Sequence, residues 1–278
     1  MTNDFDAQLS RTLSAATENI RRAVAASFTP AWKIQLAPHL LEGLAQAIAP
    51  LQPTLDRLDS MMPENWQGQR LPYKDMILLM QEGVPLAWVP PAGVIRQLLA
   101  AEDATERAEI IDDCRPEILD ACTETLETVT DIRLTTQTAL LAECVQMTER
   151  GMFNGAQALA ANVWDTLFRG LAFGNSAWLT EKGWWSYKRI QERIPSFDVG
   201  KDSTIGQFRK AAVFLPFPAT LEEFRRPQPV PHAFNRHATA HATGAVQYSA
   251  ANAMTALMLA SSVLREIDDQ EYSLEFHA

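Results

Sequence analysis

The amino-acid sequence predicts an all-α protein, and three observations lead to this fold class. Glycine is scarce, with 12 among 278 residues, and runs of β-branched residues are few. Alanine, leucine, glutamate, glutamine and arginine, which favour helices, are abundant along most of the chain. Apolar residues also recur at three- and four-residue spacing over several long segments. Because 47% of the residues are hydrophobic, we expect a folded helical bundle with a substantial core.

The first region, residues 1–114, is expected to be an N-terminal helical extension. Prolines set the limits of its elements, because proline interrupts a helix except in the first turn. The second helix is expected to be kinked by Pro50 and Pro53 and closed by Pro63, and the proline-rich stretch 63–92 to form short helices or irregular connections. The helices predicted here cover residues 5–27, residues 37–48 with a continuation towards Met61, and residues 91–100 and 103–112.

The second region, residues 115–278, begins with Pro116, which suits the first turn of a longer helix. The strongest amphipathic pattern of the chain follows at 154–173, where a broad apolar stripe indicates a buried helix. The first part of an insertion at about 174–232 carries Trp178, Trp184, Trp185 and Tyr187 among basic residues. These side chains could form a base-stacking surface, but we interpret them as a hydrophobic cluster. The other helices predicted here cover 116–131, a pattern from Leu140 to Gly151, and residues 204–214 and 245–267.

The charge is unevenly distributed along the chain. The net charge is −10, but residues 180–245 carry ten Lys and Arg against six acids, a local balance of +4 that leaves −14 for the remainder. An acidic protein is not a general nucleic-acid coat, since such binding depends on Lys and Arg neutralising phosphates. The basic segment permits selective contact with a polyanion, although a solvated surface of mixed charge explains it equally well.

The three cysteines, Cys114, Cys122 and Cys144, lie in helical patterns without C-x-x-C spacing, so we expect reduced side chains. The first residues lack the basic patch and apolar core of a secretory signal. No segment approaches the roughly 20 apolar residues that a membrane helix requires. These features predict a cytoplasmic protein that does not enter a membrane.

Polar chemistry concentrates in one short segment, Phe234-Asn235-Arg236-His237-Ala238-Thr239-Ala240-His241, just before the last predicted helix. If the segment is helical, His237 and His241 share a face, whereas Arg236 and His241 lie about 140° apart. Arginine can hold a phosphate by two hydrogen bonds, and histidine can transfer protons near neutral pH. Asn235 could orient a phosphate or cap the helix. This combination is suited to cleavage of a phosphodiester.

The segment resembles the R-x4-6-H motif of the HEPN superfamily of four-helix domains. In that family the residue after the arginine is typically Asn, Asp or His, and here it is His237. The string Asn-Arg-His-x3-His also resembles an uncharacterised bacterial subgroup of HEPN-like proteins. The resemblance covers about residues 116–270 and implies a HEPN-like C-terminal four-helix core. The insertion and the acidic net charge depart from the family pattern.

The resemblance implies a metal-independent endoribonuclease that needs no cofactor and cleaves RNA as a homodimer with a composite site. On this basis Arg236 would bind the scissile phosphate and His241 would exchange protons, with His237 and Asn235 in support. The family further implies a toxin or an antiviral defence component, with an antitoxin or another defence protein as partner.

Three other interpretations of the segment remain open. In a structural one, the histidines form a pair at a helix start and Arg236 forms an ion pair with an acid such as Glu266 or Asp268. In a second, His237 and His241 bind a metal such as zinc with His232 or a carboxylate. In a third, the chain is a HEPN-like binding or scaffold protein without catalysis.

Other catalytic motifs are absent from the sequence. It contains no glycine-rich phosphate loop, no G-x-S-x-G elbow and no cysteine paired with a nearby histidine. Glu124, Glu127 and Asp131 recur at helical spacing, which can occur in a carboxylate-bridged metal site. A solvated helix face is the simpler interpretation of these three acids.

Overall fold

The computed structural model describes residues 52–175, 179, 208, 211–225, 227–270 and 272–276. The elements it contains there are helices, which confirms the predicted all-α class for this part of the chain. The chain divides into two compact units, residues 1–62 and 63–278. The predicted boundary at 114/115 lies inside the second unit. The helices predicted at 5–27 and 37–48, part of the one predicted at 204–214 and the aromatic cluster of the insertion lie outside the described residues.

In the first unit the described part is helix α3, Gln52–Ser60. The helix ends where the backbone N–H of Met62 donates to the carbonyl of Asp59 at 2.9 Å. The Ser60 hydroxyl donates to the carbonyl of Arg57 at 2.8 Å, which satisfies another group of the last turn. The predicted helical continuation towards Met61 is therefore present.

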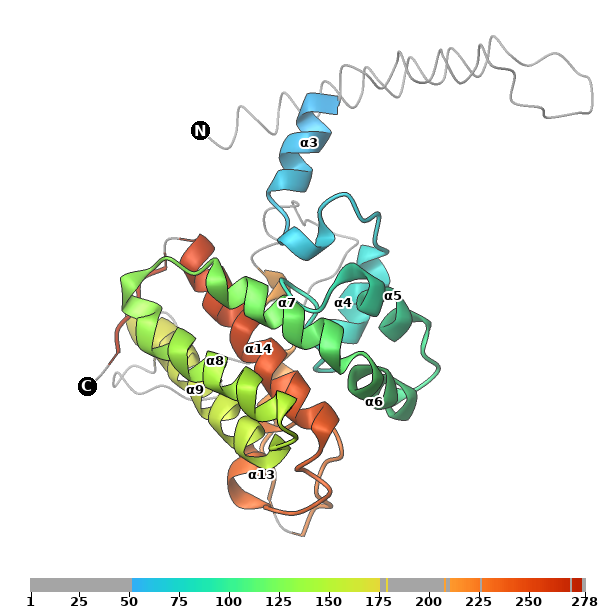
Figure 1. The fold of residues 1–278 in the computed structure, drawn as a ribbon, viewed down its shortest axis with the longest axis vertical. Helices are drawn as coiled ribbons and strands as arrows, with labels where there is room; N and C mark the ends of the chain where they lie inside the picture. The colour runs from blue at the N-terminus through green and yellow to red at the C-terminus, as the bar shows by residue number, and fades with distance from the viewer. Residues whose placement is uncertain are drawn as a thin grey trace, which may run out of the picture. The chain divides into compact units, whose positions relative to one another are not determined.

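The second unit starts with short elements and then forms a bundle of long helices (Figure 1). Pro116 occupies the first turn of α7, as its sequence position predicts. The strongest predicted helix, 154–173, is observed as α9 within one residue at each end. The elements are η2 (Glu64–Trp66), α4 (Tyr73–Gln81), α5 (Ala92–Ala100), α6 (Ala104–Asp113), α7 (Arg115–Glu127), η3 (Ile132–Leu134), α8 (Thr135–Glu149), α9 (Phe153–Gly174), α12 (Phe217–Thr220), α13 (Arg236–His241) and α14 (Ala250–Asp269).

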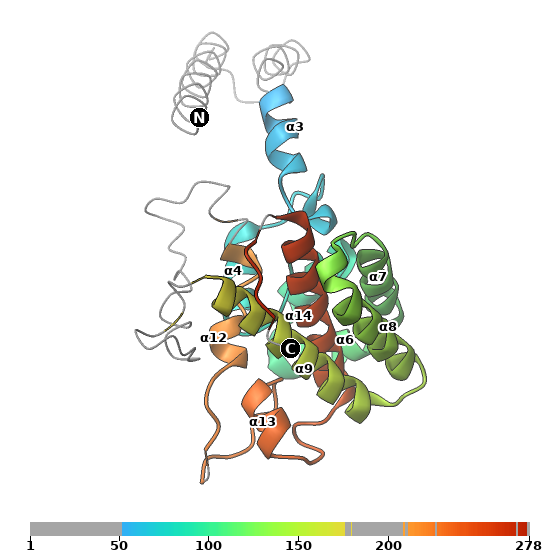
Figure 2. The same cartoon turned by 90° about the vertical axis from the view of Figure 1, so that its left-hand side faces the viewer.

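Helix α14 is the centre of the bundle. It packs against α6, α7, α8 and α9. In Figure 2, α9 crosses in front of α14, and α7 and α8 lie to its right. Every residue from Asn252 to Ile267 is buried, so this helix has no solvated face over four turns. A helix that is buried all round is typical of the core of a larger domain.

Two polar residues of α14 are buried against the segment that precedes α5. The φ angle of Trp88 is +68°, which is rare for a bulky residue and requires supporting contacts. Its indole Nε1 donates to Glu266 Oε2 at 3.1 Å, and the Arg265 guanidinium lies 4.7 Å from the centre of its ring. Tyr272 donates its hydroxyl to the other oxygen of Glu266 at 3.1 Å. These contacts hold the segment and the C-terminal residues on the central helix.

The C-terminal segment lies along α9 at two glycines. The backbone N–H of Glu275 donates to the carbonyl of Gly170 at 3.1 Å. A Cβ atom at Gly170 would lie 2.6 Å from the ring of Phe276, and one at Gly174 would overlap the carbonyl of Ser273. The close approach of the backbone therefore requires glycine at 174, whereas a side chain at 170 would displace the ring of Phe276.

Within the described residues, no helix has both the length and the apolar character needed to cross a membrane.

Candidate functional site

Helix α13 carries the predicted site and begins at an asparagine cap. Asn235 has extended backbone angles, and its side-chain oxygen accepts a hydrogen bond from the N–H of Ala238 at 2.7 Å. Its amide group donates to the carbonyl of Glu222 at 2.9 Å. Because the residue is also 95% buried, both ends of its side chain serve to fix the start of α13. Of the two roles considered for Asn235, the structure places it in the capping one.

Arg236, the first residue of α13, points to helix α9. Its Nη2 atom lies 3.1 Å from Oδ2 of Asp165, and the exposed fractions of the two side chains are 16% and 8%. Oδ2 of Asp165 also accepts from Nε of Arg169 at 2.9 Å. Two guanidinium groups therefore meet at one carboxylate oxygen. Arg236 forms the kind of ion pair that the structural interpretation expects, but with Asp165 and not with Glu266 or Asp268.

His237 and His241 lie side by side on α13. Their ring centres are 4.6 Å apart with the planes inclined by 58°, which confirms that the four-residue spacing places them on one face. His241 is exposed and His237 is half-buried. Nδ1 of His237 and Nε of Arg236 are both buried without a hydrogen-bond partner among the described residues. The site thus has hydrogen-bonding capacity that its described neighbours do not use.

A buried amide network holds α13 in place. Gln247, in the loop between α13 and α14, is fully buried, and its Oε1 accepts from the N–H of Asn235 at 3.0 Å and from the hydroxyl of Thr239 at 3.1 Å. Gln157 of α9 donates to Thr239 Oγ1 at 3.1 Å and to the carbonyl of Gln247 at 3.0 Å. The network connects α13 to α9, so the position of the site residues depends on both helices (Figure 2).

The acids proposed as alternatives have other surroundings. Asp268 accepts from the backbone N–H groups of Thr130 and Asp131 at 2.8 and 2.7 Å, and Arg265 donates to it at 3.1 Å. Glu124 and Glu127 are exposed on α7, as predicted for a solvated face. Asp131, the third acid of that set, differs: it lies beyond the end of α7, is half-buried, caps η3 and forms an ion pair with Arg133. Among the residues that the structure describes, no three His, Cys, Asp or Glu side chains gather as metal ligands would.

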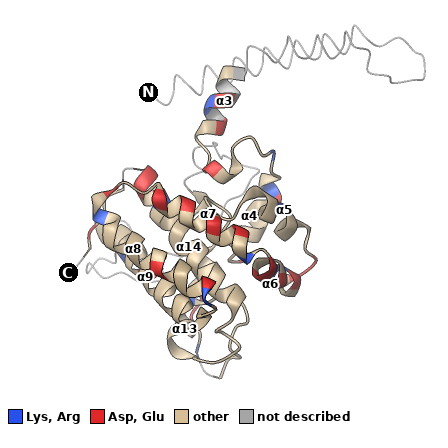
Figure 3. Ribbon diagram, in the orientation of Figure 1, with Lys and Arg blue, Asp and Glu red and all other residues tan. Residues whose placement is uncertain are grey.

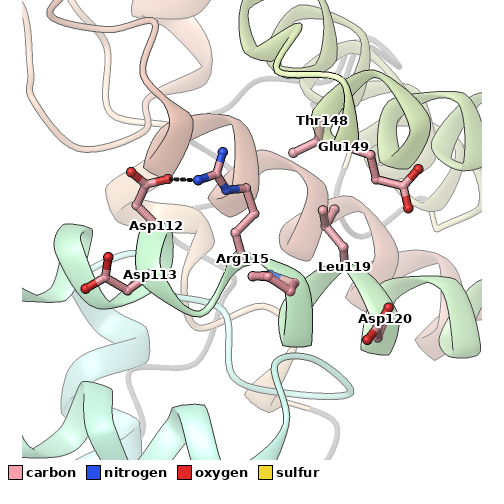
Figure 4. A pocket seen from close by; sticks show the side chains of 8 residues that line it. Asp112, Asp113, Arg115, Leu119, Asp120, Thr148 and Glu149 are labelled. Carbon is pink, nitrogen blue, oxygen red and sulfur yellow. Dashed lines mark ion pairs between the residues drawn. The ribbon is translucent and has the colours of Figure 1, made fainter.

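An acidic hollow lies where the end of α6, the start of α7 and the end of α8 meet (Figure 4). The carboxylates of Asp112, Asp113, Asp120 and Glu149 line it, together with Arg115, whose Nη2 lies 3.1 Å from Asp112 Oδ1. Acids also follow the exposed face of α7 and part of α6 (Figure 3). Four carboxylates against one arginine repel a phosphate, so this hollow is not a binding site for a nucleic-acid backbone.

Three residues of the α13 site were not found from the sequence, namely Gln157, Asp165 and Gln247. Asp165 lies beside the apolar stripe of α9, four residues before Arg169. An acid next to an apolar stripe with an arginine one turn away is the sequence signal that could have identified it. The two glutamines occupy unremarkable positions in the sequence, because their partners lie 82 and 12 residues away.

The chain matches no protein-family model, no curated protein and no solved structure.

Proposed function

We propose that α13 carries a site for metal-independent cleavage of RNA, as the resemblance to HEPN domains implies. The observation that carries the proposal is the pair of imidazoles 4.6 Å apart, with His241 exposed, on the same short helix as a partly buried arginine. This arrangement provides a cation for a phosphate and two groups that transfer protons near neutral pH. Arg236 and the two histidines are therefore assigned to the reaction.

In the proposed reaction Arg236 binds a non-bridging oxygen of the scissile phosphate. One imidazole takes the proton of the ribose 2′-hydroxyl, whose oxygen attacks phosphorus, and the bond from phosphorus to the 5′-oxygen breaks. The other protonated imidazole gives its proton to the leaving 5′-oxygen. The products are a cyclic 2′,3′-phosphate and a 5′-hydroxyl. His241, the more exposed ring, is assigned to the 2′-hydroxyl, and the protonated His237 to the leaving 5′-oxygen.

The wider proposal follows the family resemblance. Two protomers would bring their α13 helices into one composite site, and the homodimer would act as a toxin or an antiviral defence component with an antitoxin or defence partner. Asn235 would support this site indirectly: its side chain caps α13 and so fixes the position of the helix that carries Arg236 and the histidines.

A second candidate function, a helical binding or scaffold protein without catalysis, is favoured by one specific contact. The Asp165 carboxylate neutralises part of the charge of Arg236 and anchors it to α9 at 3.1 Å. An arginine held in this way can serve the fold alone. The same contact would suit a structural protein that has no enzymatic site.

The test is cleavage of fluorescently labelled single-stranded RNA in excess EDTA. We expect wild type to produce cyclic phosphate ends and His241→Ala to be slower by at least about 100-fold, since a general acid or base contributes 10² to 10⁴. Arg236→Ala should lose activity to a similar degree. His232→Ala is the control, because His232 is also exposed but lies before α13. Circular dichroism and thermal unfolding of each variant show whether the fold persists.

Cleavage that survives both Arg236→Ala and His241→Ala would contradict the ribonuclease proposal. If wild type leaves RNA intact and Arg236→Ala only lowers the unfolding temperature, Arg236 serves the fold; a stable partner that co-purifies with wild type and with Arg236→Ala alike would then favour the scaffold candidate over a purely structural protein.

A further inference from the structure

The end of α13 is held by a tyrosine from the loop that follows it. The last carbonyl groups of a helix have no backbone partner within the helix itself. In α13 the N–H of Ala242 donates to the carbonyl of Ala238 at 2.7 Å. The next carbonyl, that of Thr239, accepts a hydrogen bond from the hydroxyl of Tyr248 at 2.8 Å. The side chain of Tyr248 therefore caps the C-terminal end of the helix that carries the histidines.

Thr239, which receives this hydrogen bond, is buried and is also held through its side chain. Its hydroxyl donates to Oε1 of Gln247 and accepts from Nε2 of Gln157, both at 3.1 Å. In the chain Thr239 lies midway between His237 and His241, so its backbone belongs to the turn that spaces the two rings. The contacts of Thr239 therefore determine how this turn sits in the fold.

Tyr248 is itself fixed to the start of the central helix. Its N–H donates to the carbonyl of Gly244 at 2.9 Å, and the next residue, Ser249, caps α14. The residue before it, Gln247, accepts from the N–H of Asn235 at 3.0 Å at the other end of α13. Two consecutive loop residues thus hold opposite ends of α13, and the buried helix α14 anchors both of them.

We propose that Tyr248 is a positioning residue for the histidine pair, an inference that rests on the proposed function and deepens it. The last turn of so short a helix opens readily unless other contacts hold it. Opening moves His241 relative to His237, whose ring centre lies 4.6 Å away. Tyr248 does not take part in the reaction itself. Its hydroxyl acts through the Thr239 carbonyl and keeps the two imidazoles in the arrangement that cleavage requires.

The variant Tyr248→Phe tests the effect on the helix, because it removes the hydroxyl and keeps the ring. NMR of the full-length protein without RNA gives two measurements. Hydrogen exchange of the Ala242 N–H should become about twofold to tenfold faster, the factor that one hydrogen bond contributes to a local equilibrium. The nuclear Overhauser effect between the ring protons of His237 and His241 should become weaker, because the rings spend less time in contact.

The kinetic measurement is cleavage of single-stranded RNA in excess EDTA. Tyr248→Phe should lower kcat by about threefold to tenfold and leave KM nearly unchanged, because a misplacement of about 1 Å at the reacting groups can cost on the order of 100-fold in rate. The loss is smaller than this limit since the last turn opens for only part of the time. A purely structural role of Tyr248 would lower the unfolding temperature and leave kcat of the folded variant unchanged.

Thr138→Val is the matched control. The half-buried Thr138 of α8 donates its hydroxyl to the carbonyl of Leu134 at 3.0 Å, so its replacement removes the same kind of hydrogen bond from another helix. The inference is overturned if wild type cleaves RNA and Tyr248→Phe matches Thr138→Val in kcat, in exchange and in the ring contact, or if Tyr248→Phe raises KM instead. A wild type that cleaves no RNA contradicts the proposed function, and Tyr248 is then a cap of α13 alone.

Discussion

At the scale of single residues, burial determines the chemistry of the three cysteines. Cys122 and Cys144 are fully buried in α7 and α8, and desolvation raises the pKa of each thiol from 9.0 to about 12. The pKa of Cys114, between α6 and α7, is also raised, first by desolvation and then by the nearby negative charge of Glu117. Since the thiolate is the reactive form, these residues lack nucleophilic character.

We predict that the two buried thiols react slowly with thiol reagents. We also predict that they make the folded protein less stable as the pH rises into the alkaline range. Their thiolate fraction at pH 8 should be about 1,000-fold below that of an unfolded chain, because three pKa units separate the states. The unfolded thiol releases its proton near pH 9 while the folded one keeps it, so the free energy of unfolding should fall from pH 9 towards pH 12. Each thiol adds at most about 1.4 kcal/mol per pH unit to this fall.

The measurement is thiol labelling of the native and urea-unfolded protein in a Cys114→Ser background, with urea titrations at several pH values. The double variant Cys122→Ala/Cys144→Ala should show a shallower loss of stability above pH 9. Equal labelling rates for native and unfolded protein would show that these thiols are accessible.

At the scale of elements, α13 is a six-residue helix that tertiary contacts must hold, because isolated helices of this length are unstable in water. The cap at Asn235 and the amide network around Gln247 provide these contacts. The Arg236–Asp165 ion pair adds a third connection to α9. The orientation of the histidine pair therefore depends on residues outside the motif itself.

We predict that Asn235→Ala lowers the free energy of unfolding by about 1 to 2 kcal/mol, the usual cost of losing a helix cap. Asn235→Ser should recover part of this loss, because serine also caps helices, although it cannot reach Glu222 as the amide does. Urea titrations of the two variants measure the difference. RNA cleavage should persist in Asn235→Ser if the role of Asn235 is to cap α13. Equal stability of the alanine and serine variants would argue against the cap.

At the scale of the whole second unit, stability depends on the buried helix α14. Leu257 and Leu264 are fully buried, and the helix that carries them packs against α7, α8 and α9. The C-terminal residues and the segment around Trp88 also attach to this helix. A defect in α14 should therefore affect all of these elements together.

We predict that Leu264→Ala destabilises the protein by about 2 to 5 kcal/mol, since it removes buried methyl groups and leaves a cavity. Leu78→Ala is the control, because Leu78 on α4 is 54% exposed and its loss should change stability by less than about 0.5 kcal/mol. Chemical denaturation followed by circular dichroism compares the two variants. A small effect of Leu264→Ala would mean that the core around α14 is loosely packed.

Local patterns were sufficient to predict most of the helices of the bundle. Helix α9 follows the prediction within one residue at each end, because its apolar stripe is long and regular. The last helix was predicted from residue 245 but begins at Ala250, where Ser249 caps it by accepting from the N–H of Asn252 at 3.1 Å. The preceding residues form a loop in which Gln247 binds backbone groups of the segment before α13. These hydrogen bonds of Gln247 join residues that are far apart in the sequence, so the later start of the helix leaves no periodic signal.

The sequence by itself determined the all-α class of the described chain, the limits of its most periodic helices and the common face of His237 and His241. These properties arise from neighbours within a few turns, which composition and spacing record directly. Only the tertiary structure decided that Arg236 meets Asp165 and Arg169, and that Asn235 and Gln247 fix the start of α13. Such contacts join residues far apart in the chain, and their energies depend on burial and geometry that appear only after the helices have packed.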